Sequence, residues 1–559
     1  MHGCGAYKSI AALLMVVSVL ASLTVLAAER TPQQESFDRL QEEQRRREQR
    51  RADDVFLPGP ARAAEQVDIE SSGPCFTVTA IELRVANGLA PQLEAVLSSR
   101  IQAATGACLT AFGLQQLHRE LSNHLTGKGF VTSRLLIPEQ DLDQAELVFA
   151  LVAGRIERVE TEGLSSRKVR LALPVRSGRL LNLRDLEQAI ENLGRVRGLE
   201  AAFDILPGSD NGESVLRMLG QQGRRVGATM VVNEKYYGST MHGSALLNTE
   251  IGSPFGLTDR LLVALNTDLD RAVSDRSWGG GVDYEIGLRY WLIAAGFSRQ
   301  AYLNRVDAAF ERLDATGETD TSRFELGRVL HRSSTTRVNL TALFSYSDVL
   351  NDLDDTVIRV SSYQLNSSGA RLDISYRWHR LQLSGGVTAE YSEGHGPGTA
   401  LLTGESIADI HNQRVQLNIS GMYPFVWQNG SLQLRWNGQH SDNELFPLQR
   451  FSVASGVRGF DDISVTGNSG HTFSMEYAIS PRIGSTGIWA RPFFATELGW
   501  VPSQGDETEF NRLAGITAGS DISWKRLRIG LEASAPIQRV STKESDNSHV
   551  VRARMTLSL

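Results

Sequence analysis

Two short stretches organise the rest of the chain: Leu448–Phe460, LQRFSVASGVRGF, and Phe494–Gly499, FATELG. The first is typical of a strand end followed by a loop, and it places Arg458 just before Gly459, where the backbone can bend sharply. The second is typical of a short apolar strand that carries a single carboxylate, Glu497. An ionised carboxylate is costly to bury among apolar groups, so Glu497 must lie on a polar side of its strand.

The composition excludes several classes of protein. The chain has 559 residues, which is enough for several domains. Hydrophobic residues make up 41% and charged residues 22%, which excludes a disordered chain and a bundle of membrane helices. The net charge of −7 gives no support for a nucleic-acid partner.

Residues 1–27 have the pattern of a secretory signal peptide. Lys8 supplies the positive charge, Ile10–Ala21 is the apolar segment, and Val25–Ala27 is a small-residue cleavage site. The alternative is an uncleaved anchor, because the apolar run continues to Ala28. No later stretch approaches the ~20 apolar residues of a spanning helix. An exported chain of this kind can still be integral to a membrane as a closed β-barrel.

Residues 28–72 are polar. Thr31–Asp53 is rich in good helix formers, with glutamates ahead of arginines, and it has no apolar stripe. Such a segment is either a solvated helix or linker, or a polar helix inside a water-filled pore. Residues 54–72, which include Pro58 and Pro60, are interpreted as a linker.

Residues 73–153 are predicted to form a small α/β domain. Alternation at residues 81–85 indicates a strand, and further strands are expected at Val131–Ile137 and Leu147–Val152. A helix with Thr110 as N-cap presents one apolar face, formed by Leu114, Leu117, Leu121 and Leu125. Cys75 and Cys108 are the only cysteines left after signal removal, so they should pair in an oxidising compartment. Two sulfurs without nearby histidines are too few for a metal site.

Residues 154–224 repeat this plan without cysteines. Asn182 is the expected N-cap of a second amphipathic helix, whose apolar face is Leu183, Leu186, Ile190 and Leu193. Two strands, Ala202–Leu206 and Val215–Leu219, are joined by a turn-rich segment.

Helical periodicity gives way to alternation in residues 225–559, which we assign to one β-barrel. In Val551–Leu559, for example, apolar residues alternate with Arg552 and Arg554. A soluble sandwich of this size would need helices or a second inner face, whereas closure with the polar side inward explains arginines on nearly every strand. About 16 antiparallel strands of about 10 residues fit this length. Turns are expected at the clusters Ser277–Gly281, Asn366–Gly369 and Gly394–Gly398.

Catalytic signatures are missing from the sequence. It contains no HExxH, GxSxG, P-loop or paired CxxC motif. Gly467–His471 has some likeness to a serine-protease turn but is better interpreted as loop sequence. We therefore expect no catalytic residue, no metal and no cofactor, and no enzymatic activity.

Val457–Phe460, VRGF, resembles the VRGF/VRGY tetrapeptide of the outer-membrane transporter superfamily, which includes two-partner secretion translocators and barrel assembly factors. The resemblance implies that this loop folds back into the barrel lumen and that its arginine meets an acid of an F-x-D-x-G segment. The aligned segment here is Ala495–Gly499, with Glu in place of Asp and Ala in place of Phe. The residues implied in this lumen-loop lock are Val457, Arg458, Gly459, Phe460, Glu497 and Gly499.

Gly127–Val159 resembles the end of the first POTRA (polypeptide-transport-associated) domain of two-partner secretion translocators. The recurring elements are G-[FY]-x-T-[ST]-R, a Pro-x-Gln turn and a closing G-R-I, and they occur here in the same order. The residues that carry this resemblance are Gly129, Arg134, Pro138, Gln140, Gly154 and Arg155. Residues 154–224 resemble a second POTRA domain.

Together these resemblances imply an outer-membrane translocator of the hemolysin secretion/activation type, with two periplasmic POTRA domains and a polar plug helix. Its implied partners are a secreted exoprotein with an N-terminal secretion domain, outer-membrane lipid, periplasmic chaperones and the barrel assembly machinery. The alternatives are a barrel insertase of the same superfamily, which usually carries more POTRA domains, a passive porin with periplasmic binding domains, and a barrel enzyme, which the missing motifs disfavour.

Overall fold

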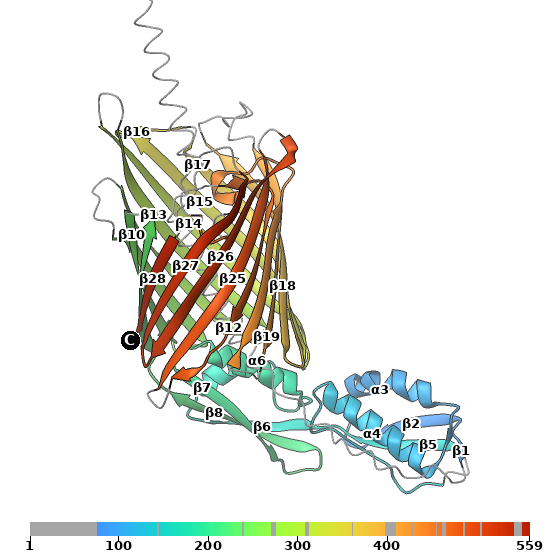
Figure 1. Cartoon of the computed structure of the whole chain (residues 1–559). Helices are drawn as coiled ribbons and strands as arrows, with labels where there is room; N and C mark the ends of the chain where they lie inside the picture. The colour runs from blue at the N-terminus through green and yellow to red at the C-terminus, as the bar shows by residue number, and fades with distance from the viewer. Residues whose placement is uncertain are drawn as a thin grey trace, which may run out of the picture.

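The computed structural model shows two small α/β domains beneath one β-barrel (Figure 1). The expected signal peptide and polar helix, within residues 1–72, lie outside the described residues. The structure describes residues 75–141, 145–237, 240–269, 275–307, 312–359, 361–396, 410–425, 429–453, 456–460, 465–483, 487–503, 506–540 and 550–559.

The first α/β domain packs two helices against a three-stranded sheet of order β2-β5-β4. Thr110 caps the second helix, because its side chain accepts a hydrogen bond from the backbone N–H of Gly113 at 3.1 Å. Cys75 and Cys108 form a disulfide with their Cα atoms 5.4 Å apart. The elements are β1 (Phe76–Thr77), β2 (Ala80–Val85), α3 (Pro91–Ala104), β3 (Cys108–Leu109), α4 (Ala111–Gly127), β4 (Arg134–Leu136) and β5 (Glu146–Val152).

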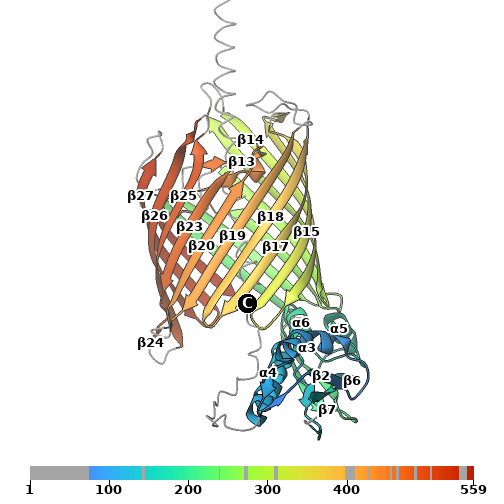
Figure 2. The ribbon, with the colours of Figure 1, turned by 90° about the vertical axis from the view of Figure 1, so that its right-hand side faces the viewer.

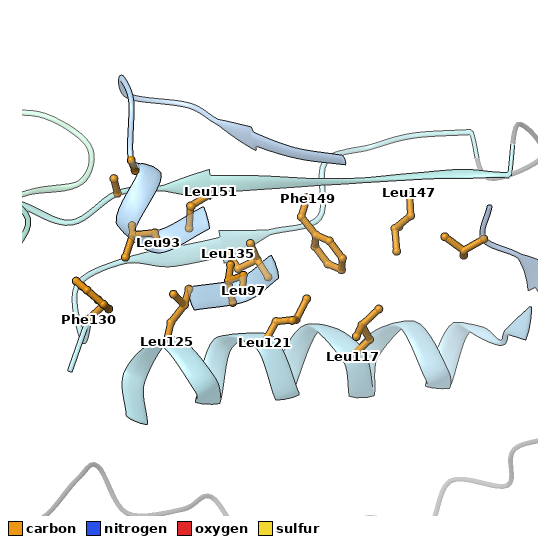
Figure 3. Close-up of a cluster of buried hydrophobic side chains, with 13 residues drawn as sticks. Leu93, Leu97, Leu117, Leu121, Leu125, Phe130, Leu135, Leu147, Phe149 and Leu151 are labelled. Atoms are coloured by element: carbon orange, nitrogen blue, oxygen red, sulfur yellow. The ribbon is translucent and has the colours of Figure 1, made fainter. Parts of the chain in front are cut away.

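The core of this domain lies between both helices and the sheet (Figure 3). Its fully buried members on β5 are Leu147, Phe149 and Leu151. The strand predicted at Val131–Ile137 is shorter than expected, because residues 131–133 turn toward the second domain. Helix α3, which supplies Leu93 and Leu97 to the core, was not predicted.

The second α/β domain has a three-stranded sheet of order β6-β8-β7 and two helices. Asn182 caps the longer helix by accepting a hydrogen bond from the backbone N–H of Arg184 at 2.9 Å. The shorter helix, capped by Ser165, was not predicted. The elements are β6 (Arg155–Glu162), α5 (Ser166–Ala172), α6 (Leu183–Gly194), β7 (Leu199–Pro207) and β8 (Glu213–Gln222). No helix of the described residues is long and apolar enough to cross a membrane.

Sixteen long antiparallel strands close into the barrel, and two two-residue strands, β16 (Thr356–Val357) and β24 (Arg482–Ile483), extend its loops. The last strand closes the barrel on the first, from Val550 opposite Tyr237 to Ser558 opposite Thr229. The predicted fold class is thereby confirmed, apart from the polar helix. The first eight strands are β9 (Val226–Tyr237), β10 (Thr240–Gly252), β11 (Asp259–Asp268), β12 (Asp275–Leu288), β13 (Trp291–Asp307), β14 (Arg312–Arg332), β15 (Thr336–Leu353) and β17 (Tyr363–Trp378). The other eight are β18 (Leu381–His395), β19 (His411–Pro424), β20 (Ser431–His440), β23 (Gly470–Ala478), β25 (Ile488–Ser503), β26 (Asp506–Trp524), β27 (Leu527–Val540) and β28 (Val550–Ser558).

The strands of the barrel are strongly tilted (Figure 2). Their side chains alternate between an apolar outer surface and a charged inner surface. On β17, Leu372 and Ile374 are exposed on the outside. Between them in sequence, Asp373 accepts a hydrogen bond from Arg371 inside, at 3.1 Å. Four exposed tryptophans border the turns nearest the second α/β domain, where they form the aromatic girdle of a membrane barrel: Trp291, Trp378, Trp489 and Trp524.

Two glycine-rich clusters predicted as turns lie inside strands instead. Ser277–Gly281 belongs to β12 and Asn366–Gly369 to β17. A Cβ added at Gly279 would lie 1.9 Å from Oε1 of Gln300, and one at Gly369 would lie 2.5 Å from the carbonyl oxygen of Ala389. These glycines leave room for atoms of the neighbouring strands. The glycine content that predicted turns is therefore explained by close packing between strands.

Candidate functional site

The described part of the connection between β20 and β23, residues 441–453, 456–460 and 465–469, turns back into the barrel and packs against its inner wall; we call it the lumen loop. Its described part contains η4 (Pro447–Gln449), a short 3-10 helix, and a hairpin of β21 (Phe451–Ser452) and β22 (Thr466–Gly467). Apolar side chains of the loop form a buried cluster with Val501 of β25 and Leu513 of β26. The loop members of the cluster are Val453, Val457, Phe460 and Val465.

Arg458 contacts the wall through both its backbone and its side chain. Its backbone N–H donates to Oε2 of Glu497 at 2.6 Å, and its Nε donates to Oε1 of the same carboxylate at 2.5 Å. Its Nη1 donates to Glu532 of β27 at 3.2 Å, and its Nη2 lies 3.7 Å from Glu476 of β23. The planar fork of a guanidinium can address several carboxylates at once, which a lysine cannot copy. The structure therefore places Arg458 at the centre of a carboxylate cluster on the inner wall.

Alternation along β25 presents both Glu497 and Gly499 to the loop. Leu498 is 47% exposed on the outside, whereas Glu497 is 3% exposed on the inside. A Cβ added at Gly499 would lie 2.2 Å from Cγ1 of Val453, so a side chain there would push the loop off the wall. Gly459 has φ +100°, a conformation that favours glycine, and this lets the chain turn immediately after Arg458.

One departure from the family's acidic segment, Ala in place of Phe, has an aromatic side chain close by. Ala495, which stands where the family has Phe, is fully buried. The ring of Phe493 lies two residues earlier on the same inner face, with its centroid 5.5 Å from Cζ of Arg458 and 5.7 Å from Cζ of Arg491. A guanidinium is attracted to an aromatic face. Arg458 therefore has an aromatic neighbour in addition to its carboxylate partners.

Several members of this cluster were not predicted from the sequence. Steps of two residues back from Glu497 lead to Phe493 and Arg491 on the same face, so alternation could have found these two. The others lie on β23, β27 and β28, and their alignment with Arg458 depends on strand register. Arg491 pairs with Glu476, and Arg552 donates to Glu532 at 3.0 Å.

A second anchor, also not predicted, holds the loop at Gln449. This side chain is 2% exposed, donates to Ser392 of β18 at 2.7 Å and accepts from Asn412 of β19 at 2.9 Å. The backbone carbonyl of Gln449 accepts from Gln439 of β20 at 2.8 Å. Gln449 also donates to Glu390 at 3.3 Å and its carbonyl accepts from Arg414 at 3.1 Å, so the lumen loop is attached to the wall by hydrogen bonds at Gln449 and by ion pairs at Arg458.

Three residues of the POTRA motif build the junction between the two α/β domains. The carbonyl of Gly129 accepts from the backbone N–H of Leu183 at 2.8 Å, and Gly129 has φ +98°. A Cβ added at Gly154 would lie 2.1 Å from Oγ1 of Thr132. Arg155 donates to the carbonyl of Leu89 at 2.6 Å. These positions therefore set how the domains join.

The other three motif residues lie at the edge of the first sheet. The amide of Gln140 donates to the carbonyl of Val148 at 2.9 Å and accepts from its N–H at 2.7 Å, as a neighbouring strand would. It also donates to the carbonyl of Pro138 at 3.3 Å. Arg134 begins β4, pairs with Val152 of β5 and is exposed. The Gln140 side chain thus provides hydrogen-bond partners for the backbone of Val148 in β5, beyond the point where β4 ends.

The haemolysin secretion/activation protein family ShlB/FhaC/HecB matches residues 212–522, which is more than half of the chain. The chain belongs to this family. A ShlB-type POTRA domain matches residues 76–154 and a second POTRA domain matches residues 155–207. The chain is therefore an outer-membrane transporter of the two-partner secretion type, with its barrel in the outer membrane and its POTRA domains in the periplasm.

Named relatives agree with this assignment. The outer membrane transporter CdiB of Escherichia coli is 28% identical over 507 residues, which cover 87% of this chain and 83% of the relative. The hemolysin transporter protein ShlB of Serratia marcescens is 24% identical, over 88% of this chain and 86% of the relative. The structure of CdiB from E. coli covers 95% of this chain and 99% of its own with a TM-score of 0.80 at 23% identity, which shows the shared fold.

Proposed function

We propose that the barrel carries one large exoprotein, unfolded, from the periplasm to the cell surface, and that folding outside supplies the driving force. The observation that carries this proposal is the lumen loop, which is fixed across the inner wall by Arg458 and Gln449. A loop attached by so many polar contacts has a defined closed position. A passing chain would have to displace it or slide past it.

In this proposal the POTRA domains capture the exoprotein's N-terminal secretion domain before it enters the pore. Both three-stranded sheets have edge strands within the described residues, and β7, with nine residues, is the longest. An edge strand offers unpaired backbone groups to which an extended segment can add. Periplasmic chaperones and the barrel assembly machinery are expected to deliver the barrel itself to the membrane.

The test is co-expression of this chain with a large exoprotein encoded beside it, followed by assay of the medium. Secretion of the intact exoprotein is expected, whereas the same exoprotein without its N-terminal secretion domain should remain in the periplasm. Absence of the full-length exoprotein from the medium, with both proteins made and the barrel inserted, would contradict the proposal. Uptake of small solutes without any secretion would favour a passive porin instead.

A further inference from the structure

One face of α6 is polar and nevertheless buried. Its side chains are spaced by three and four residues, which puts them on a single stripe of the helix. The five members have exposed fractions of 6% or less: Arg184, Glu187, Gln188, Glu191 and Asn192. Buried charges are costly unless they are paired, so this face is shaped for a specific polar partner.

The partner is the periplasmic rim of the barrel, which lies directly above α6 (Figure 1). Arg332 ends β14, and Arg337 lies at the start of β15. The carboxylate of Glu191 is 2.8 Å from Nη1 of Arg332 and 2.8 Å from Nη2 of Arg337. Arg332 also donates to Gln188 at 2.6 Å and lies 3.4 Å from Glu187. All of these charged side chains are at least nine-tenths buried.

The same helix holds a second turn of the rim, between β12 and β13. The hydroxyl of Tyr290 donates to Asp185 at 2.5 Å, and Asn192 donates to the carbonyl of Arg289 at 2.7 Å. The backbone N–H of Arg289 donates to the carbonyl of Leu171 in α5 at 2.8 Å. Contacts to two separate hairpins resist both sliding and rotation of α6 beneath the barrel.

The first turn of α6 also holds the other POTRA domain. Leu183 donates its N–H to the carbonyl of Gly129 at 2.8 Å, and the side chain of Asn182 donates to the carbonyl of Lys128 at 3.2 Å. Lys128 follows the end of α4 in the first domain. Helix α6 is therefore bonded to the first POTRA domain at one end and to the barrel along its polar face.

We propose that the polar face of α6 is a docking surface that fixes the orientation of both POTRA domains beneath the pore, and that Glu187, Glu191, Arg332 and Arg337 are positioning residues for secretion. Paired charges specify one orientation, because any other leaves a buried charge without its partner. The effect on secretion rests on the function proposed above, whereas the docking itself does not.

The experiment measures the distance between spin labels in the full chain, reconstituted in lipid nanodiscs with the native disulfide intact. The labels replace two exposed residues, Ser99 in the first POTRA domain and Arg380 in a rim turn. We expect a narrow distance distribution in the wild type and a broad one in Glu191→Gln and Arg337→Gln. The double variant should be no broader than the worse single variant, because coupled residues are not additive.

Secretion is measured in the same variants, at matched levels of inserted barrel. We expect Glu191→Gln and Arg337→Gln to lower it about tenfold. Glu191→Gln takes from the buried Arg337 the carboxylate that contacts it at 2.8 Å, and Arg337→Gln removes one of the guanidinium groups that compensate the buried Glu191. Arg176→Gln, at an exposed position of the same domain, should change neither readout. Tyr290→Phe removes only one hydroxyl and should also broaden the distribution, which keeps the test decisive if Glu191→Gln does not insert.

A narrow distance distribution in Glu191→Gln or Tyr290→Phe would contradict the proposal that the polar face of α6 is a docking surface. A broad distribution with undiminished secretion would overturn the role of these residues in positioning. A wild type that secretes nothing, yet gives a narrow distribution that Glu191→Gln broadens, would contradict the proposed function and leave the docking surface standing.

Discussion

At the scale of single residues, the wall around Arg458 is balanced in charge. Glu476, Glu497 and Glu532 face the guanidinium of Arg458, and Arg491 and Arg552 take part in the same cluster. Burial makes each of these contacts stronger than a surface ion pair of about 0–1 kcal/mol. Removal of one charged residue of this cluster is therefore destabilising, because its partners keep their charges and lose the opposite charge that compensates them.

Arg458→Ala should lower secretion strongly while the barrel still inserts. Loss of one partner of a fully buried ion pair costs about 3–5 kcal/mol, and the cost here is smaller because the Arg458 side chain is 25% exposed. A loss of about 1.4 kcal/mol already corresponds to tenfold, so we expect a fall of about tenfold or more, measured by exoprotein in the medium. Arg458→Lys should restore secretion only in part, because it keeps the charge but not the fork. Arg528→Ala, which removes an arginine from the inner face of β27 away from the loop, is the control.

Glu497→Ala should show a similar defect, and the double variant with Arg458→Ala should add little to either single loss. Fully additive losses, or wild-type secretion by Arg458→Ala, would show that these two residues do not hold the loop.

Gly499→Ala should loosen the lumen loop. The new Cβ would overlap Val453, and overpacking of this kind costs about 1–3 kcal/mol, so channel conductance in planar bilayers should rise. Val453→Ala in the same chain removes the overlapping methyl group and should bring conductance back toward the wild-type value. The matched control is Gly385→Ala, where the nearest atom is 3.4 Å away. Equal conductance in Gly499→Ala and wild type would place the loop away from this glycine.

At the scale of elements, α6 differs from an ordinary amphipathic helix because both of its faces are buried. Leu186 and Leu193 pack into the domain core, and Glu187 and Glu191 meet the barrel. Burial alone would raise the pKa of the Glu191 carboxyl. The guanidinium groups of Arg337, Arg332 and Arg195 outweigh this effect and lower the pKa to about 2.

Docking of α6 should consequently depend on pH in one direction. The pKa of Glu191 is about 2 when docked against an ordinary value of 4.5, so its contribution is complete above about pH 4.5 and is lost as the pH falls toward 2. The spin-label distance should stay narrow at neutral pH and broaden within this window. Burial raises the pKa of Asp185, which acts in the opposite direction, so Glu191→Gln is the reference that isolates Glu191. The distribution of Glu191→Gln should already be broad at neutral pH and should not broaden further between pH 4.5 and 2. A change from narrow to broad in this variant over the same pH range would assign the effect to another group.

At the scale of the whole molecule, three parts must act together: the POTRA pair, the barrel and the lumen loop. The POTRA pair contacts the periplasmic rim through α6, and the lumen loop is attached to the wall through β18, β19, β25 and β27. These attachments lie on different strands, so a passing chain could displace the loop without undocking the POTRA domains.

Deletion of Thr31–Asp53 should raise channel conductance and leave secretion largely intact. The reason is compositional: this segment carries many charges and no apolar face, which suits a water-filled lumen and not a core. Conductance is measured in planar bilayers, with deletion of residues 54–72 as the control for shortening the chain. Unchanged conductance after the first deletion would place the segment outside the pore.

Much of the structure of this protein follows from local sequence patterns alone. Alternation in residues 225–559 predicted the membrane barrel, because the side chains of each strand face lipid and lumen in turn with a period of two. The length of this segment, at about 10 residues a strand, predicted the strand number. Helix α4 and the apolar face of α6 followed from their spacing and their N-caps, Thr110 and Asn182. The turn predicted at Asn366–Gly369 was wrong, because the same glycines can serve close packing between strands.

Apart from the pair of Arg458 and Glu497, which the family resemblance implied, only the tertiary structure decided which charges meet. Glu532 lies next to Arg458 because barrel closure and strand register align β27 with the lumen loop, and no local period encodes that alignment. The spacing of α6 predicted only its apolar face. The polar stripe on its other side consists of residue types, such as arginine and glutamate, that are usually exposed. It is buried because two barrel hairpins present matching groups to it, and this complementarity exists only once the chain has folded.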